Sequence, residues 1–542
     1  MKKNIIRVCA LLLAAYLYCA ALDPYFFDYP CWVLFFRQIY GLLLATGVLY
    51  ACVRLKWLGV AIYAIFSLLF GVLHYAYVVL GYSAGFEFVS AVFQTNVHEL
   101  KGFVSFTSIL ALLGGVVVLT GVYGLAVYSI QWKKLNLKEG LLLLSVVVIW
   151  LGIYEIPALT IGKRYGFYRK MADNTLRNDH ELYIAGHMGV AVARWCSPYS
   201  NVRQLQGGVK EYFREIDIAE SSSYASHDKR PNDDMVFILV LGESVRADHV
   251  PAGGYHRNTM PRISHEPGVC FFTRMYSYAS STYDSVAAIL SGMVKQGDVP
   301  LVTSFAGILK QHGFEGRLYS ENTMNITDSK RFSVLLGQYM KSCASCRGAI
   351  EDISAKIVRE INACSGKRQF VVIENGTGHF PYINEDKYDV YHPCNTDWFV
   401  PAPDNHKELL INDYDNCLVS VDVFLSDIIN GVKQRNAVML YISDHGQLLG
   451  EEGKLMHGDS ENPILRSPAA FIWFSDEYKR RYPKLVADMQ SVRDKPLVHG
   501  QVYATVLKLV GIESEVPLQI GDFVEGDVRN CPNNVPTSLL SE

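Results

Sequence analysis

Residues 235–248 read MVFILVLGESVRAD, a run of seven apolar residues that ends in Gly242 and continues into Glu243, Ser244 and Arg246. A buried strand that breaks at a glycine and then offers a carboxylate is how a parallel α/β sheet presents chemistry at the carboxyl ends of its strands. Long apolar runs precede this stretch, and most of the charged residues follow it. We therefore expect a membrane part followed by a water-soluble α/β domain.

The composition agrees with this division. The chain has 542 residues, of which 50% are hydrophobic and only 19% are charged, which is apolar for a soluble protein of this size. Its formal net charge is −3. A nucleic-acid partner normally requires a basic face, so this charge gives no support for one.

Five apolar stretches in the first half each approach the ~20 residues that cross a bilayer. Lys2 and Lys3 precede the first stretch, but it lacks a small-residue cleavage site, so we expect a retained helix and not a signal peptide. The basic residues fall on alternate sides of the spans, on one face that should be cytoplasmic. An odd number of spans then places the rest of the chain outside. The stretches are residues 4–22, 32–53, 57–80, 106–130 and 141–161.

This reasoning gives three predicted parts. Residues 1–162 form a transmembrane domain with five helices, and residues 163–234 form short interfacial helices and a polar linker. Residues 235–542 form the soluble catalytic domain.

Cysteines give independent support for an external location. Eight of the 12 cysteines fall in the soluble half, which suits an oxidising compartment and predicts disulfide bonds. Their connectivity stays open, and Cys343 with Cys346 is alternatively a redox or zinc pair. The eight are Cys196, Cys270, Cys343, Cys346, Cys364, Cys394, Cys417 and Cys531.

The predicted outer loop between the third and fourth spans carries a polar cluster, FQTNVHE, at residues 93–99. Glu99 could meet an ammonium group there, and Asn96 or Thr95 could meet a phosphate. The alternative is an ordinary helix start that Thr95 or Asn96 caps.

Four later segments repeat the pattern of an apolar strand followed by a polar turn: residues 316–320, 370–373, 437–442 and 469–474. Helical patterns lie between them, such as 413–429 and 502–510. Strands that alternate with helices predict a mostly parallel sheet covered on both faces.

Residues 279–292, ASSTYDSVAAILSG, place small hydroxyl residues before an apolar helical run that glycine closes. The N-terminus of such a helix binds phosphate, and a threonine hydroxyl there could attack phosphorus. The alternative is a helix cap without a catalytic role.

Acidic and imidazole residues follow the predicted strands. Glu243, Asp444 and His445 are ligands of the kind that zinc accepts in sites with an open coordination position. His379 and His457 lie in glycine-containing turns and could bind phosphoryl oxygens or move a proton.

Taken together, these motifs resemble the phosphoethanolamine transferases of Gram-negative envelopes, the five-span, zinc-dependent branch of the alkaline phosphatase and sulfatase superfamily. The resemblance covers essentially the whole chain. The motifs are LGESVRAD at 241–248, YHRNTMP at 255–261, the serine–threonine–serine set at 280–285, SDHGQLLGE at 443–451 and MHG at 456–458.

The resemblance implies that Thr282 is both the nucleophile and a zinc ligand, and that Glu243, Asp444 and His445 complete the zinc site. It implies that the enzyme takes phosphoethanolamine from phosphatidylethanolamine, through a phosphothreonine intermediate, at the periplasmic face of the inner membrane. A monomer is expected.

Further roles follow from the same resemblance. His379 and His457 would handle the phosphoethanolamine group or a second metal, and Asn322 with Thr323 matches a substrate-binding pair. The polar loop that contains Asn96 and Glu99 would also contact substrate. The lysine that usually follows the Asn322–Thr323 pair is absent.

The acceptor stays open, because the cysteines that frame the nucleophile helix in lipid A enzymes are replaced by Tyr278 and Ala288. Lipid A, a core sugar or a surface protein such as pilin are comparable acceptors.

Three other functions fit the sequence less well. A glycerol-phosphate transferase of the lipoteichoic acid type is disfavoured by the many cysteines and the polar loop near Glu99. A non-catalytic scaffold predicts loss of the ligand residues, which are all present. A sulfatase would need Cys-x-Pro-x-Arg where Thr282, Tyr283 and Asp284 stand.

Overall fold

The structure of the protein is a computed structural model that describes helix 106–129 and, in the second half, residues 218–292, 301–320, 333–342, 349–382, 385–394, 407–451, 455–457, 462–518 and 520–530. Short pieces between residues 58 and 92 and between 205 and 209 are also described. The chain divides into two compact units, residues 1–89 with 105–213 and residues 90–104 with 214–542. The second is called the sheet unit below.

Helix α6, Phe106–Ser129, belongs to the first unit and coincides with the fourth expected span. The first, second and fifth expected spans lie outside the described residues, as does most of the third. In the part of the chain that the structure describes, no helix has both the length and the apolar character that crossing a membrane requires. The five-span arrangement stays a prediction.

The sheet unit is built on a seven-stranded sheet in the order β4, β13, β10, β3, β9, β7, β8. Strands β10, β3, β9, β7 and β8 pair in parallel, and β13 runs antiparallel to both of its neighbours. The predicted, mostly parallel sheet is confirmed. The strands are β4 Val269–Phe271, β13 Ala470–Phe474, β10 Ala437–Ser443, β3 Val236–Gly242, β9 Gln369–Asn375, β7 Glu315–Ser320 and β8 Lys341–Ser342.

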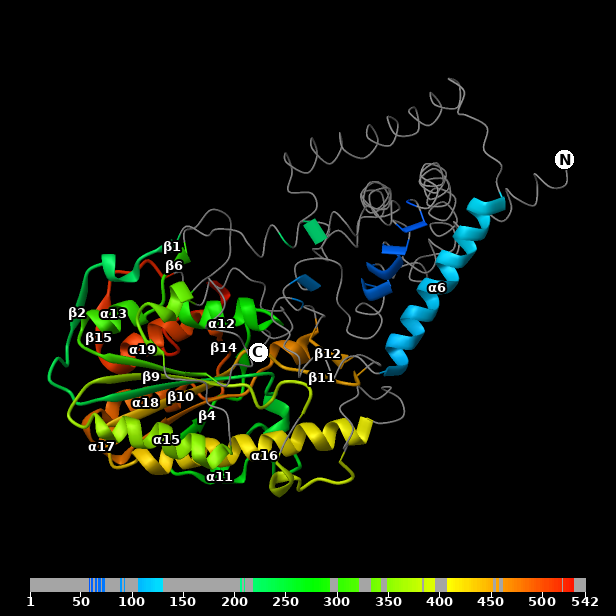
Figure 1. Cartoon of the computed structure of the whole chain (residues 1–542). Helices are drawn as coiled ribbons and strands as arrows, with labels where there is room; N and C mark the ends of the chain where they lie inside the picture. Colours follow the sequence, from blue (N-terminus) through cyan, green and yellow to red (C-terminus); the bar gives the residue numbers. More distant parts are fainter. Residues whose placement is uncertain are drawn as a thin grey trace, which may run out of the picture. The chain divides into compact units, whose positions relative to one another are not determined.

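Helices cover both faces of this sheet, as Figure 1 shows. One layer contains α12, α13 and α19, and the other contains α11, α15 and α16. Because both faces are covered, every residue of β3, β9 and β10 is buried, which explains the continuous apolar run at the start of the 235–248 stretch. The helices are α11 Pro261–His265, α12 Thr282–Ser291, α13 Ala306–Gln311, α15 Ile350–Ala363, α16 Lys407–Val432 and α19 Val502–Val510.

The predicted helices are confirmed. Helix α19 has the expected bounds, and α16 extends the expected 413–429 at both ends. Helix α12 begins at Thr282, immediately after the N-cap residue Ser281, and ends before Gly292, whose φ of 59° is left-handed.

One predicted repeat is corrected. Residues 469–474 do form a strand, β13, but it runs antiparallel to β10, so its polar turn lies at the opposite edge from the turns that follow β3 and β10. Ser475 accepts a hydrogen bond from the backbone N–H of Ala437, at the start of β10, at 3.1 Å. Its side chain caps helix α17, Asp476–Arg481, and so serves structure.

Two short strands come from the end of the stretch that the sequence places in the linker. Strand β1, Ile218–Ala219, pairs in parallel with β6, Leu301–Val302. Strand β2, Ser226–Asp228, pairs antiparallel with β15, Ile512–Ser514. Residues 218–228 are therefore bonded into the sheet unit. The remaining strands and helix of this unit are β5 Met275–Tyr276, β11 Leu448–Leu449, β12 Leu455–Met456, β14 Leu497–Val498 and α18 Pro483–Ser491.

Four of the eight cysteines of the soluble half are described, and none of the four is in a disulfide: Cys270, Cys364, Cys394 and Cys417. The expected disulfides are therefore not formed among these four. The other four cysteines, including the Cys343 and Cys346 pair, lie outside the described residues.

The motif at 255–261 is held by one buried carboxylate of α16. Asp415 is fully buried and receives hydrogen bonds from His249 Nδ1 at 2.8 Å, the Tyr255 hydroxyl at 2.7 Å and Arg257 Nη1 at 2.9 Å. These contacts fasten the segment that follows β3 to the helix layer that contains α16.

We expect Asp415→Ala to lower the free energy of unfolding by about 3–5 kcal/mol, because it leaves Arg257 and two further polar groups without their buried acceptor. Thermal and urea unfolding of the full-length protein would measure this. Asp427→Ala, in the same helix, is the matched control. It removes a partly exposed ion pair with Arg262 at 4.0 Å and one hydrogen bond from the Ser354 hydroxyl at 3.2 Å, and should cost about 1–2 kcal/mol. Equal stability of the two variants would contradict the buried anchor.

Candidate active site

The parallel pairing of β3 and β10 brings the predicted acidic residues together. Gly242 lies opposite Ser443 in the register of the two strands. Glu243 and Asp444 follow these residues, so both emerge at one edge of the sheet. A side chain at position 242 would meet the hydroxyl of Tyr441, because a Cβ built there lies 2.3 Å from it. Glycine at this position permits the close approach.

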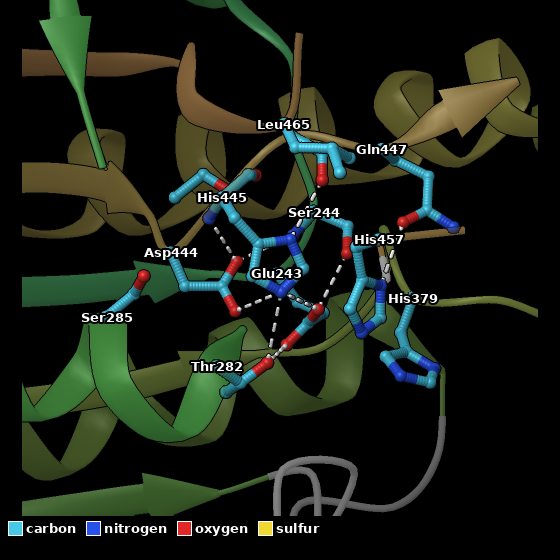
Figure 2. A network of polar contacts seen from close by, with 12 residues as sticks. Glu243, Ser244, Thr282, Ser285, His379, Asp444, His445, Gln447, His457 and Leu465 are labelled. Carbon is cyan, nitrogen blue, oxygen red and sulfur yellow. Dashed lines mark hydrogen bonds and ion pairs between the residues drawn. The ribbon is translucent and has the colours of Figure 1, made fainter. Parts of the chain in front are cut away.

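Thr282 reaches the same place from the next helix. Its hydroxyl donates a hydrogen bond to Glu243 Oε2 at 3.1 Å and lies 3.3 Å from His445 Nε2. Figure 2 shows Thr282, Glu243, Asp444 and His445 pointing toward one another. The four residues come from three separate regions of the sequence and meet in one cluster.

The cluster has the geometry of a cation site. One ligand atom from each of Glu243, Asp444 and His445 lies within 4.8 Å of the other two. His445 Nε2 is 3.2 Å from Asp444 Oδ2 and 3.7 Å from Glu243 Oε1. All three side chains are buried. Carboxylate oxygens and imidazole nitrogens are ligands that zinc accepts.

Hydrogen bonds leave the inward-facing atoms available. Asp444 Oδ1 accepts from the backbone N–H groups of Ser244, at 2.9 Å, and His445, at 2.7 Å. Within the described residues, the buried Asp444 Oδ2 has no hydrogen-bond donor. His445 Nδ1 donates to the carbonyl of Gly446 at 2.8 Å, so the neutral ring keeps its lone pair on Nε2. A buried carboxylate oxygen without a donor fits a cation.

The electrostatics agree with the geometry. Burial, and then the neighbouring charge of Asp444, raise the pKa of Glu243 well above its usual range. Two buried carboxylates that face each other are costly to ionise together unless a positive charge lies between them. The residues present therefore fit a divalent metal.

The two predicted imidazoles lie beside this cluster. The ring centroid of His457 is 4.4 Å from that of His445 and 6.4 Å from that of His379. His457 Nδ1 lies 3.1 Å from Gln447 Oε1, an acceptor that fixes the proton of the neutral ring on Nδ1. Burial, and then the neighbouring histidines His445 and His379, lower the pKa of His457. The structure thus brings together all six predicted catalytic and metal-site residues.

Four predicted substrate-binding residues lie outside the part of the chain that the structure describes: Asn322, Thr323, Asn96 and Glu99.

Four residues near the cluster received no role from sequence reasoning: Ser244, Arg246, Tyr414 and Gln447. Ser244 and Arg246 lie in the 235–248 stretch, and Gln447 lies two residues after His445. Their position next to these motifs could have identified them from the sequence. Tyr414 lies within α16 and has no such signal.

Arg246 connects the two turns that carry the ligands. It is almost fully buried, donates to the carbonyl of Gln447 at 3.1 Å and pairs with Glu451 at 2.5 Å. It also pairs with Asp248 at 2.7 Å. The turn after β3 is thereby tied to the segment that follows β10.

Gly378 packs against the same turn. A Cβ built on Gly378 would lie 2.2 Å from the carbonyl oxygen of Glu243 and 3.2 Å from a methyl group of Val245. Glycine at this position lets the chain that carries His379 come close to Glu243.

Comparisons with known proteins identify the family of the chain. The family model described as Sulfatase matches residues 236–512, about half of the chain. The phosphoethanolamine transferase EptA of Escherichia coli O157:H7 is 25% identical over 396 residues, which cover 66% of this chain and 67% of that protein. The Kdo(2)-lipid A phosphoethanolamine 7''-transferase of Escherichia coli K12 is 27% identical over 315 residues, 52% of each chain.

A solved structure shares the fold. The integral membrane protein lipooligosaccharide phosphoethanolamine transferase A from Neisseria meningitidis superposes with a TM-score of 0.69, covering 94% of this chain and 96% of its own. Its sequence identity is 18%, so the likeness is one of fold.

Proposed function

Because the chain belongs to the sulfatase family, we propose that it is a metal-dependent phosphoethanolamine transferase of the bacterial envelope. The observation that carries the proposal is the convergence of the Thr282 hydroxyl with Glu243, Asp444 and His445 at the ends of two parallel strands. The curated relatives above, which are phosphoethanolamine transferases, support this activity.

The proposed metal is zinc. Glu243, Asp444 and His445 would hold it, with the Thr282 oxygen as a fourth ligand, a donor set of oxygen and nitrogen atoms that zinc accepts. A bound zinc ion would lower the pKa of the Thr282 hydroxyl and offset negative charge on the phosphoryl oxygens.

In the first half of the proposed reaction, Thr282 Oγ1 attacks the phosphorus of phosphatidylethanolamine. The bond between phosphorus and the diacylglycerol oxygen breaks. This oxygen takes a proton from His379, or from His457 once the negatively charged phosphate of the substrate lies beside that ring and offsets the lowering of its pKa. The hydroxyl proton of Thr282 passes to solvent water, so this half-reaction is balanced in protons. Phosphoethanolamine stays bound to Thr282, at the N-terminus of α12, where the positive end of the helix dipole favours its charge.

In the second half, a hydroxyl or phosphate of the acceptor attacks the same phosphorus and the bond to Thr282 Oγ1 breaks. The histidine that gave its proton to diacylglycerol takes one from the acceptor, and Thr282 takes a proton back from solvent water. We propose an envelope acceptor, either lipid A or a core sugar of lipopolysaccharide or lipooligosaccharide, or a surface protein such as pilin. Asn322, Thr323, Asn96 and Glu99 are proposed to bind substrate.

The proposal extends to location. We propose a monomer with five helices within residues 1–162 in the inner membrane, interfacial segments within 163–234, and a catalytic domain from 235–542 in the periplasm. The similar Neisseria protein is described as an integral membrane protein, which supports this arrangement.

We expect full-length wild-type protein in detergent to carry about one zinc ion per chain, and Asp444→Ala to carry little, because the variant loses a buried ligand. Mass spectrometry of the purified, acid-digested proteins would measure the metal. Asp494→Ala is the control, because this carboxylate is exposed and should leave the zinc content unchanged. Equal and negligible zinc in wild type and Asp444→Ala would favour a non-catalytic scaffold.

Incubation with phosphatidylethanolamine should place phosphoethanolamine on Thr282, and mass spectrometry of tryptic peptides would locate it. Thr282→Ala should show no adduct and lose transfer activity on the order of 10³-fold or more, because the nucleophile is gone. Phosphatidylglycerol should give no adduct.

Two outcomes would overturn this. If wild type consumed phosphatidylethanolamine without forming an adduct, the covalent mechanism would be wrong. A glycerol-phosphate adduct from phosphatidylglycerol would instead identify an enzyme of the lipoteichoic acid type.

A further inference from the structure

The turn that follows β3 has an unusual backbone at Ser244. Within the described residues, Ser244 is the one residue other than glycine with a positive φ, at 60°. This left-handed conformation is costly for a residue with a side chain and persists where its surroundings enforce it. The turn must therefore be held by contacts from elsewhere.

Ser244 lies between the two carboxylates of the proposed metal site. Its backbone N–H donates to Asp444 Oδ1 at 2.9 Å, and its hydroxyl donates to Glu243 Oε1 at 2.7 Å. A change in the backbone at Ser244 would move both donors. The conformation of this single residue consequently sets the direction of Glu243 and Asp444 together.

Tyr414, from helix α16, forms two hydrogen bonds with the backbone of this turn. The Tyr414 hydroxyl donates to the carbonyl of Ser244 at 2.8 Å and accepts from the backbone N–H of Arg246, also at 2.8 Å. The side chain is fully buried, and burial raises its pKa, so the hydroxyl keeps its proton and can donate. One oxygen thus satisfies two backbone groups, two residues apart, that water does not reach.

Tyr414 is itself held firmly. Its ring packs edge-on against His249 and Tyr382, with centroids 5.2 Å away in both pairs. The next residue, Asp415, anchors His249 and the segment at 255–257. The hydroxyl is therefore delivered to the turn from a fixed position.

We propose that Tyr414 is a positioning residue, which holds Ser244 in its left-handed conformation and thereby aligns Glu243 and Asp444 to bind zinc. The inference rests on the proposed zinc site. Helix α16, which carries none of the proposed ligands, would then contribute to metal affinity.

The test compares two substitutions that each remove one buried tyrosine hydroxyl, Tyr414→Phe and Tyr441→Phe. Tyr441 is also fully buried and lies on β10 beneath the same turn, with its hydroxyl against Gly242. Within the described residues, that hydroxyl has no hydrogen-bond partner. Zinc affinity of the full-length proteins in detergent would be measured by competition with a chelator, together with thermal unfolding of the metal-free forms.

Tyr414→Phe should bind zinc about 10- to 100-fold more weakly than wild type. This is the usual loss when a residue that orients metal ligands is removed. Tyr441→Phe should bind zinc as wild type does. Unchanged affinity in Tyr414→Phe, or an equal loss in both variants, would overturn the proposal even if Tyr414→Phe melted at a lower temperature. Failure of wild type to bind zinc would instead reject the proposed metal site.

A second variant keeps the test decisive if Tyr414→Phe does not fold. Replacement of Tyr414 by 4-aminophenylalanine keeps a donor for the Ser244 carbonyl in a side chain of similar size. Its zinc affinity should be lower than that of wild type, because the Arg246 N–H loses its acceptor. If Tyr414→Phe folds, the affinity of the new variant should lie between those of Tyr414→Phe and wild type. Wild-type zinc affinity in this variant would contradict a role for both hydrogen bonds of the Tyr414 hydroxyl.

Discussion

In the sheet unit, β3 and β10 run in parallel with Gly242 opposite Ser443. This pairing makes Glu243 and Asp444 neighbours although 201 positions separate them in the sequence (444 minus 243). Strand direction also determines which residues lie far from the site. Because β13 runs antiparallel to β10, its polar turn lies at the opposite edge of the sheet, where Ser475 caps helix α17. The hydroxyl of Thr282 reaches the cluster because α12 begins at that residue.

Bringing two carboxylates into one buried place is unfavourable unless their charge is compensated. Backbone N–H groups satisfy Asp444 Oδ1, and the Ser244 and Thr282 hydroxyls satisfy Glu243. These donors leave Asp444 Oδ2 facing His445 Nε2, an arrangement that a divalent cation completes. Arg246 contacts both turns that carry the cluster, and Tyr414 contacts the turn after β3, so the geometry of the cluster also depends on residues outside it.

Much of this could be predicted from the sequence, for physical reasons. Apolar runs that end in glycine and a charged residue identify the ends of β3 and β10, and hydroxyl residues before an apolar helical run identify the start of α12. The direction of β13 could not be read, because a buried strand has the same apolar pattern whichever way it runs. The role of Tyr414 was also hidden, since a tyrosine on a buried helix face resembles any other core residue until its hydroxyl is seen between two backbone groups. Composition predicts disulfides, but it does not say which cysteines the fold brings within bonding distance, and the four described ones form none with one another.

We propose that Thr282, Glu243, Asp444 and His445 share one metal ion. The most direct measurement is anomalous X-ray scattering at the zinc edge from crystals of the full-length protein. The account predicts a single strong peak about 2.0–2.2 Å from the side-chain oxygen or nitrogen atoms of all four residues. A peak elsewhere, such as at Cys343 and Cys346, or none with zinc supplied, would contradict it.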